Sequence, residues 1–205
     1  MGTQDALSSR VKDIIDFSGS VLLLAVFSPI LVLIALAVKL QDGGRIFHKR
    51  RVVGVGGVHF DALKFRTMVE NADEWLAQNP QLMAEFKRNY KLAEDPRVTK
   101  LGKILRKFSL DELPQLFNVL CGQMSLVGPR MVTPEELEKY GSLKEARVRF
   151  KPGLSGYWQV NGRQEVDYEE RVEMDRFYIE HWSIRLDIGI LFKTVYKVLR
   201  REGAF

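Results

Sequence analysis

The chain has few residues of the kinds that form disulfides or zinc sites. Among its 205 residues Cys121 is the only cysteine, which excludes an intrachain disulfide and fits a reducing compartment. The three histidines are scattered, without metal-ligand spacing. There is no internal repeat and no low-complexity tract. With 46% hydrophobic residues the chain is long enough to bury a core, and its length predicts one domain with an appendage, or two small domains.

The net charge of +5 is unevenly distributed. Residues 10–51, 91–107 and 193–201 each have a net charge of +4, whereas residues 133–180 have a net charge of −3. Basic islands of this kind attract polyanions, which include phosphorylated substrates, nucleic acid and anionic lipid.

Residues 17–38 form an uncharged, apolar run. As a helix these 22 residues would be about 33 Å long, enough for one bilayer crossing. Acidic residues before the run and its length are unlike a signal peptide, so we expect it to stay in the membrane. Ser28 and Pro29 near its middle predict a kink, and basic residues on both flanks favour cytoplasmic ends on both sides. These features leave a spanning helix and a re-entrant helix–break–helix both open.

The rest of the chain predicts an α+β fold that is mostly helical. Residues 46–68 have strand composition, and the GVGG at 54–57 predicts a hairpin turn. Amphipathic or capped helical patterns occupy residues 71–92 (interrupted at Asn79-Pro80), 99–108, 167–181 and 184–201. The last helix has a basic edge, which fits either a solvated surface or contact with anionic lipid.

Two adjacent carboxylates, Asp111 and Glu112, precede a short apolar helix. The spacing from Ser109 to Glu112 is that of a capping box, so one interpretation is that both acids only lie in the first turn of a helix. Pro114 predicts that the next helix starts there, which places both acids at its N-terminus. A second interpretation is chemical. Adjacent carboxylates with Arg106 nearby supply a nucleophile, a metal ligand and a phosphate clamp, as phosphoryl transfer requires.

Residues 151–163 combine turn residues with side chains that could hold a nucleotide. Aromatic faces, amide edges and a guanidinium group can bind a base and a pyrophosphate. These side chains are Tyr157, Trp158, Gln159, Asn161 and Arg163.

Several motifs occur together in one order: the S-P-interrupted apolar run, KFRTM at 64–68, SLDELPQLFNVL, SLVGPR and KPGLSG-x-x-QVNGR. This set resembles the bacterial sugar transferases that act on polyprenyl phosphate, the monotopic phosphoglycosyl transferases. It is most similar to the undecaprenyl-phosphate galactose phosphotransferase branch. The resemblance implies a re-entrant membrane segment in residues 1–42, hinged at Ser28 and Pro29, and a catalytic domain in residues 43–205.

The resemblance also implies a reaction, in which a UDP-sugar and undecaprenyl phosphate give undecaprenyl-diphosphate-sugar and UMP. Asp111 would be the nucleophile and would contact Mg²⁺, or Mn²⁺ in its place, and Glu112 would assist by proton transfer. The implied phosphate- and substrate-binding residues are Arg106, Lys64, Arg130, Gln159, Asn161 and Arg163. One departure is Met131, where the family usually has proline, and it predicts a looser loop at Arg130.

The implied location is the cytoplasmic face of the bacterial inner membrane, in contact with anionic lipids. The expected partners are the two substrates and in addition a second copy of the chain; nucleic acid is not expected. Two alternatives are an inactive scaffold of a glycan pathway and a membrane-anchored polyanion-binding protein. The intact acidic pair argues against the scaffold, and basic islands that flank acids argue against the polyanion-binding protein.

Overall fold

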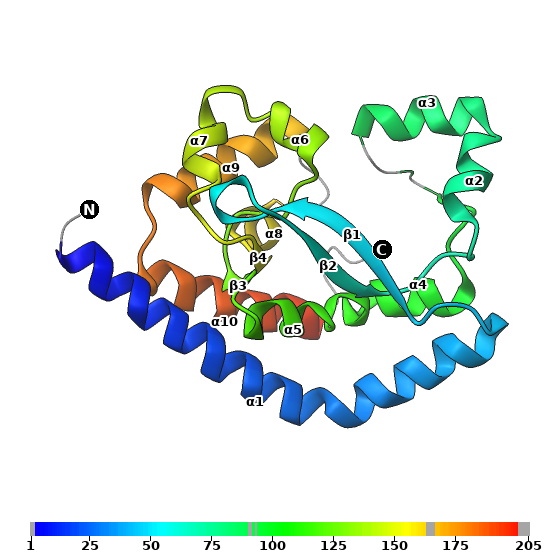
Figure 1. The fold of residues 1–205 in the computed structure, drawn as a ribbon, viewed down its shortest axis with the longest axis horizontal. Helices are drawn as coiled ribbons and strands as arrows, with labels where there is room; N and C mark the ends of the chain where they lie inside the picture. Colours follow the sequence, from blue (N-terminus) through cyan, green and yellow to red (C-terminus); the bar gives the residue numbers. More distant parts are fainter. Residues whose placement is uncertain (1–2, 90–91, 93, 163–166, 201–205) are drawn as a thin grey trace.

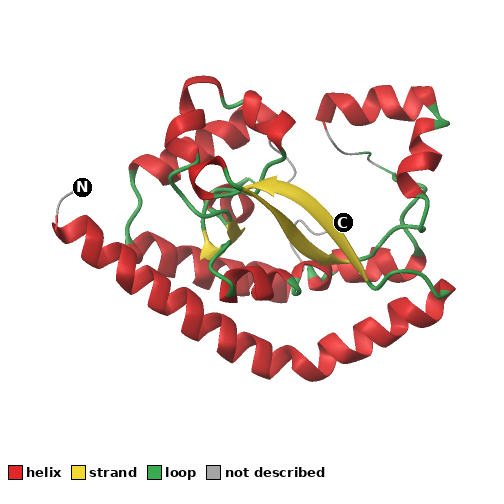
Figure 2. Cartoon of the chain, in the orientation of Figure 1, coloured by secondary structure: helices red, strands yellow, loops and turns green. Residues whose placement is uncertain are grey.

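The structure is a computed structural model that describes residues 3–89, 92, 94–162 and 167–200. Figure 2 shows that helices make up most of this part of the chain, which confirms the α+β class. The elements in chain order are α1 (Thr3–Asp42), β1 (Phe47–Val53), β2 (His59–Phe65), α2 (Ala72–Ala77), α3 (Pro80–Asn89), α4 (Lys100–Lys107), α5 (Gln115–Leu120), β3 (Ser125–Val127), α6 (Pro134–Glu138), α7 (Lys144–Arg147), β4 (Gly153–Ser155), α8 (Tyr157–Asn161), α9 (Tyr168–Glu180) and α10 (Ile184–Arg200).

Strands β1 and β2 form the predicted antiparallel hairpin, with Phe47 opposite Phe65. The chain reverses through a 3-10 turn, Val55–Gly57, in which Gly56 and Gly57 have φ angles of 66° and 79°. Such left-handed conformations favour glycine, so the GVGG sequence is a turn, as predicted. The second pairing, between β3 and β4, is parallel and was not predicted.

Helix α1 is continuous, with Pro29 inside it. Figure 1 shows it as a bent rod, so the predicted break is a bend in one helix and not an interruption. Proline has no N–H group, and the carbonyl four residues earlier, that of Ala25, loses its helical donor. The Ser28 hydroxyl donates to this carbonyl oxygen at 2.9 Å, which supplies the missing hydrogen bond. Re-entry of the segment stays a prediction, as does the domain boundary after residue 42.

One side of α1 is attached to the rest of the molecule. The Asp16 carboxylate accepts a hydrogen bond from the Leu126 backbone N–H at 2.9 Å. The Lys12 ammonium donates to the Val127 carbonyl at 2.9 Å and to the Asp187 carboxylate at 2.5 Å. These contacts join the N-terminal part of α1 to β3 and α10.

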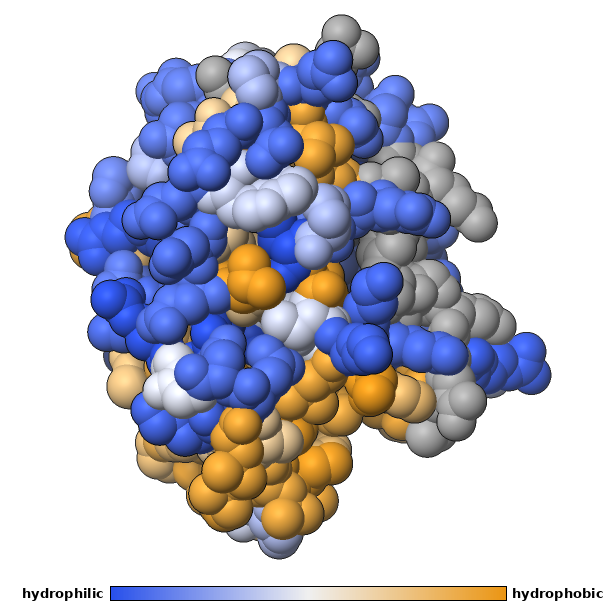
Figure 3. Space-filling model, turned by 90° about the vertical axis from the view of Figure 1, so that its right-hand side faces the viewer, coloured by the Kyte–Doolittle hydropathy of each residue, from blue (hydrophilic) through white to orange (hydrophobic). Residues whose placement is uncertain are grey.

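The other side of α1 exposes apolar side chains, among them Leu22 and Leu33, which are 63% and 65% exposed. Figure 3 shows hydrophobic residues gathered in the lower part of the molecule, where α1 lies, and hydrophilic residues above. Within the described residues, one helix, Leu7–Asp42, is long and apolar enough to cross a membrane. An exposed apolar surface of this length is unfavourable in water, so it indicates a membrane location.

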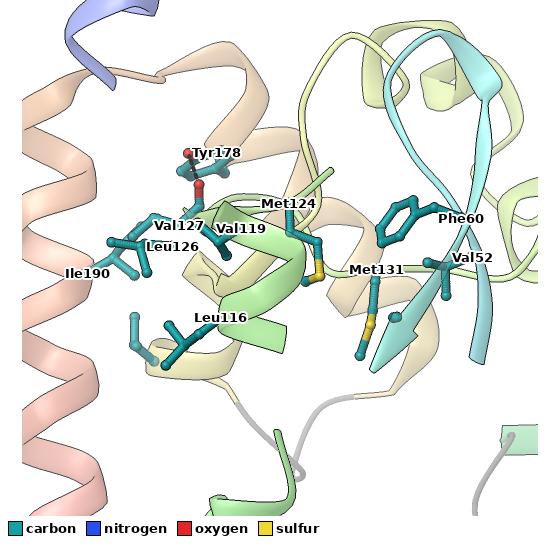
Figure 4. Close-up of a cluster of buried hydrophobic side chains, with 12 residues drawn as sticks. Val52, Phe60, Leu116, Val119, Met124, Leu126, Val127, Met131, Tyr178 and Ile190 are labelled. Carbon is teal, nitrogen blue, oxygen red and sulfur yellow. Dashed lines mark hydrogen bonds between the residues drawn. The ribbon is translucent and has the colours of Figure 1, made fainter. Parts of the chain in front are cut away.

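The main core lies between the hairpin, α5, β3 and the two C-terminal helices (Figure 4). It includes Phe60 from β2, Leu116 from α5 and Met131. The Tyr178 hydroxyl donates to the Val127 carbonyl at 3.3 Å. This packing holds the acidic pair, which directly precedes α5, against the hairpin.

Candidate active site

The acidic pair lies in a 3-10 turn, Leu110–Glu112, between α4 and α5. Ser109 before it has a left-handed φ of 54°, and its side chain makes no capping hydrogen bond, so the predicted capping box is wrong. A capping serine needs extended backbone, whereas Ser109 turns the chain sharply from one helix towards the next. Pro114 immediately precedes α5, which confirms that it starts this helix. Asp111 is only 8% exposed.

Lys64, on β2, pairs with the second acid: its ammonium lies 2.5 Å from Oε1 of Glu112. The hairpin is held over α5 by Asn118, whose Oδ1 accepts from the Leu63 N–H at 3.0 Å and whose Nδ2 donates to the Asp61 carbonyl at 2.9 Å. Because side chains alternate along a strand, fixing Leu63 on α5 turns Lys64 to the other face, towards the acidic turn.

The two carboxyl groups have opposite pKa shifts. Burial, followed by the neighbouring Glu112 carboxylate, raises the pKa of Asp111 above its usual value, and the cations Lys64 and Arg106 only partly oppose this. Burial also acts to raise the pKa of Glu112, but the charge of Lys64 and then that of Arg130 outweigh it, so this pKa is lowered. The surroundings therefore favour the protonated form of Asp111 and the ionised form of Glu112.

Arg106, near the end of α4, donates from Nε to the Thr67 hydroxyl at 3.0 Å. Burial lowers the pKa of this guanidinium group, and the charge of Asp111 acts in the opposite direction. Arg106 thus lies close enough to the acidic turn to interact with a phosphate bound there.

Arg130 follows β3 in a loop that is held at its backbone. Its carbonyl oxygen accepts a hydrogen bond from Nη2 of Arg147, which is almost fully buried, at 2.7 Å. Its guanidinium carbon lies 5.0 Å from the ring centre of Trp158. The next residue, Met131, is 3% exposed and anchored in the core; the looser loop expected from this residue stays a prediction.

The glycines of the two motifs SLVGPR and KPGLSG are explained by the parallel pairing of β3 and β4. A Cβ atom on Gly128 would lie 2.4 Å from the Lys151 carbonyl oxygen, and one on Gly153 would lie 2.1 Å from the Gly128 nitrogen. Both distances are too short for a side chain. The close approach places the Arg130 loop directly beside the segment that leads into α8.

The remaining predicted site residues are less closely tied to the acidic pair. Gln159 donates from Nε2 to the Leu154 carbonyl at 3.2 Å. Asn161 donates to the Tyr157 carbonyl at 2.9 Å and accepts from Lys193 at 3.1 Å, so it joins α8 to α10. Arg163 lies outside the described residues. The structure therefore brings five of the predicted residues together: Asp111, Glu112, Lys64, Arg106 and Arg130. The side-chain amides of Gln159 and Asn161 make hydrogen bonds within or next to α8.

Arg50 is a neighbour of the site that the sequence did not reveal. Its guanidinium group lies 2.6 Å from the Glu136 carboxylate, and its charge also contributes to lowering the pKa of Glu112. Arg50 is opposite Ala62 in the hairpin, two residues from Lys64, so alternation places Arg50 and Lys64 on the same face. Alternation within residues 48–51 indicates which of these side chains share a face. It shows that Arg50 lies near Lys64 only when the hairpin register is also known.

Comparisons with known proteins identify the family. Residues 7–201 match the family described as Bacterial sugar transferase. The chain is 46% identical to "Exopolysaccharide production protein ExoY" of Sinorhizobium fredii, over 91% of this chain and 84% of that protein. It is 45% identical to "Undecaprenyl-phosphate galactose phosphotransferase" of Salmonella typhimurium, and 40% identical to "UDP-glucose:undecaprenyl-phosphate glucose-1-phosphate transferase" of Escherichia coli. Both matches cover 97% of this chain.

A buried acidic pair among cations, on an α+β fold with a long exposed apolar helix, fits a membrane-associated transferase. The family match over residues 7–201 is more specific: the chain belongs to the bacterial sugar transferase family. It spans 42% of the length of the Salmonella and Escherichia relatives.

Proposed function

We propose that this chain transfers a hexose 1-phosphate from a UDP-sugar to undecaprenyl phosphate and releases UMP. The observation that carries the proposal is the buried Asp111, of raised pKa, beside Glu112 that is ion-paired to Lys64. The names of the Salmonella and Escherichia relatives support undecaprenyl phosphate as the acceptor. Because these names give galactose for one and glucose for the other, the sugar is left open.

In the first step an Asp111 carboxylate oxygen attacks the phosphorus atom that bears the sugar. The bond from this phosphorus to the bridging oxygen breaks, and UMP leaves with the electron pair. In the second step an oxygen of undecaprenyl phosphate attacks the same phosphorus and displaces Asp111, while Glu112 accepts the proton of the lipid phosphate. Arg106 and Arg130 bind the phosphate oxygens, where charge develops in both steps.

The acidic turn also fits Mg²⁺. No cluster of three metal-ligating side chains occurs in the described residues, which is compatible with Mg²⁺ because this ion commonly uses one or two carboxylates together with substrate phosphates and water. Asp111 would hold the ion, which would neutralise charge on the diphosphate. We expect EDTA to abolish UMP release, and Mg²⁺ or Mn²⁺ to restore it. Full activity in the chelator would refute the metal requirement.

We further propose that α1 enters and leaves the membrane on the cytoplasmic side. The site has to receive a water-soluble nucleotide sugar and a lipid whose phosphate lies at the headgroup layer. A catalytic body resting on the cytoplasmic surface meets both needs. Lys193 and Lys197 on α10 would then attract anionic lipids, each contributing about 1 kcal/mol near the surface.

The experiment is a panel of UDP-sugars incubated with undecaprenyl phosphate, Mg²⁺ and the chain in lipid nanodiscs, with UMP release as the readout. We expect UMP with at least one hexose, in equal amount to the lipid-linked product. Asp111→Asn keeps the size of the side chain but cannot act as an anionic nucleophile, so it should lose orders of magnitude in rate. Absence of UMP with every sugar would favour the inactive-scaffold alternative.

A further inference from the structure

Two guanidinium groups lie on one buried indole ring. The central carbons of Arg130 and Arg171 are each 5.0 Å from the ring centre of Trp158. Trp158 is 6% exposed and lies on α8, Arg171 lies on α9, and Arg130 lies in the loop after β3. Cation–π attraction on a fixed ring holds the two arginine side chains in place.

This cluster is rich in positive charge and in hydrogen-bond donors. Indole and guanidinium groups donate hydrogen bonds and accept none. The indole N–H of Trp158 is buried without a partner among the described residues. Burial, followed by the charge of Arg130, lowers the pKa of Arg171, so the two cations are near enough to repel each other. An anion with several acceptor oxygens would relieve this repulsion.

Arg130 links the cluster to the acidic turn. Its charge contributes to lowering the pKa of Glu112 on one side and that of Arg171 on the other. Its backbone carbonyl accepts from Arg147, and its guanidinium group lies over the Trp158 ring, so both ends of the residue have a contact. An anion that contacts both arginines therefore extends from the acidic turn towards α9.

The position of α9 indicates whether the anion near Arg130 and Arg171 is the phosphate of the lipid or that of the nucleotide. Figure 1 shows α9 on the side of the molecule away from α1, together with α6 and α7. A lipid phosphate stays near the membrane surface, on the side of α1, whereas a nucleotide reaches the opposite side from water. We propose that Arg171, together with Arg130, binds the phosphate oxygens of the nucleotide diphosphate. This inference rests on the proposed function, because it assigns a binding residue to the UDP-sugar.

The test compares Arg171→Ala and Arg171→Lys with Arg176→Ala. Arg176 lies on the same helix, but it is 39% exposed and paired with Glu173 on the surface, so it controls for loss of a cation from α9. Affinity for UDP is measured by calorimetry, and KM is measured for the UDP-sugar and for undecaprenyl phosphate separately. Thermal unfolding of every variant reports on folding.

We expect Arg171→Ala to weaken UDP binding by about 10- to 100-fold, the loss of a hydrogen-bonded charged partner. KM for the UDP-sugar should rise with it, while KM for the lipid stays unchanged. Arg171→Lys keeps the charge but lacks the planar guanidinium group. Its affinity for UDP should lie between those of wild type and Arg171→Ala. Arg176→Ala should behave as wild type.

Unchanged UDP affinity in both Arg171 variants would overturn the inference, as would a rise confined to the KM of the lipid phosphate. An Arg171→Ala protein that unfolds early, beside a folded Arg171→Lys protein with wild-type affinity, would also overturn it by showing a structural role. If wild type binds UDP through Arg171 but turns over no UDP-sugar, the proposed function fails and the binding site stands.

Discussion

Replacing Lys64 by methionine tests the electrostatics of the site. The substitution keeps most of the side-chain volume and removes the cation 2.5 Å from Glu112. The two side chains are 17% and 21% exposed, so water only partly screens the lost interaction. Removing one fixed charge partner from an enzyme site of this kind typically costs about 10²–10³ in kcat. We expect a loss in this range for Lys64→Met.

The pH dependence of kcat gives a second readout with a definite sign. Lys64 is the main reason that the pKa of the partly buried Glu112 is lowered. Without it, burial dominates and this pKa rises. If activity requires ionised Glu112, the acid limb of the profile must therefore move to higher pH in Lys64→Met.

The matched control is Lys49→Met. Lys49 is exposed on β1, opposite Leu63, and alternation puts it on the other face of the hairpin from Lys64. It should retain wild-type UMP release and an unchanged pH profile. Wild-type kcat and an unmoved acid limb in Lys64→Met would refute this account of the acidic pair.

Three further predictions concern proton transfer, stability and topology. Glu112→Gln should slow turnover by about 10²–10⁴-fold with near-wild-type folding, measured by UMP release and thermal unfolding; undiminished turnover would exclude the proton-transfer role. Burial raises the pKa of Asp175 from 3.8 to about 6, so the folded state binds this proton more tightly than the unfolded state. This contribution to stability should fall by about 2 kcal/mol as pH rises from about 4 to about 6, and it should be absent in Asp175→Asn; a pH dependence of the unfolding midpoint that is the same in both proteins over this range would contradict it. Replacing Ser28 and Pro29 by alanine should straighten α1 and expose the N-terminus outside the cell in some molecules, as read by impermeant labelling of a cysteine at position 3 in a chain lacking Cys121. Outside labelling without the alanine substitutions would show a single-pass protein.

The local features of the fold were predictable because each rests on short-range chemistry. Glycines that need left-handed backbone marked the hairpin turn at Gly56 and Gly57. Asp167 and Glu170 form the capping box that starts α9, as their spacing predicts. The serine–proline pair in α1 bends the helix, as the sequence predicts, and the Ser28 hydroxyl donates to the Ala25 carbonyl.

The β3–β4 pairing and the Lys64–Glu112 contact could not be predicted, because they join segments that are distant in the sequence and meet only in the folded state. Strands β3 and β4 are three residues long each, too short for a recognisable pattern, and their close pairing is made by Gly128 and Gly153. The same limit applies to the site. The acidic pair and Arg106 were visible as neighbours in sequence, but the contact of Lys64 with Glu112 joins residues 48 positions apart.

Ser109 matches the spacing of a capping box but does not cap a helix. Its spacing to Glu112 is that of a cap, yet its left-handed backbone makes it a sharp turn. Asp111 and Glu112 therefore do not belong to a capping box. Asp111 is instead buried near the cations Lys64 and Arg106.

The central claim is that Asp111 carries the sugar phosphate, and mass spectrometry of the protein and its peptides tests it most directly. The chain is incubated with UDP-sugar and Mg²⁺ without lipid, quenched, and digested to locate any adduct. The account predicts a hexose phosphate on Asp111, its loss on adding undecaprenyl phosphate, and no adduct in Asp111→Asn. An adduct on another residue, or wild-type turnover by Asp111→Asn, would contradict it.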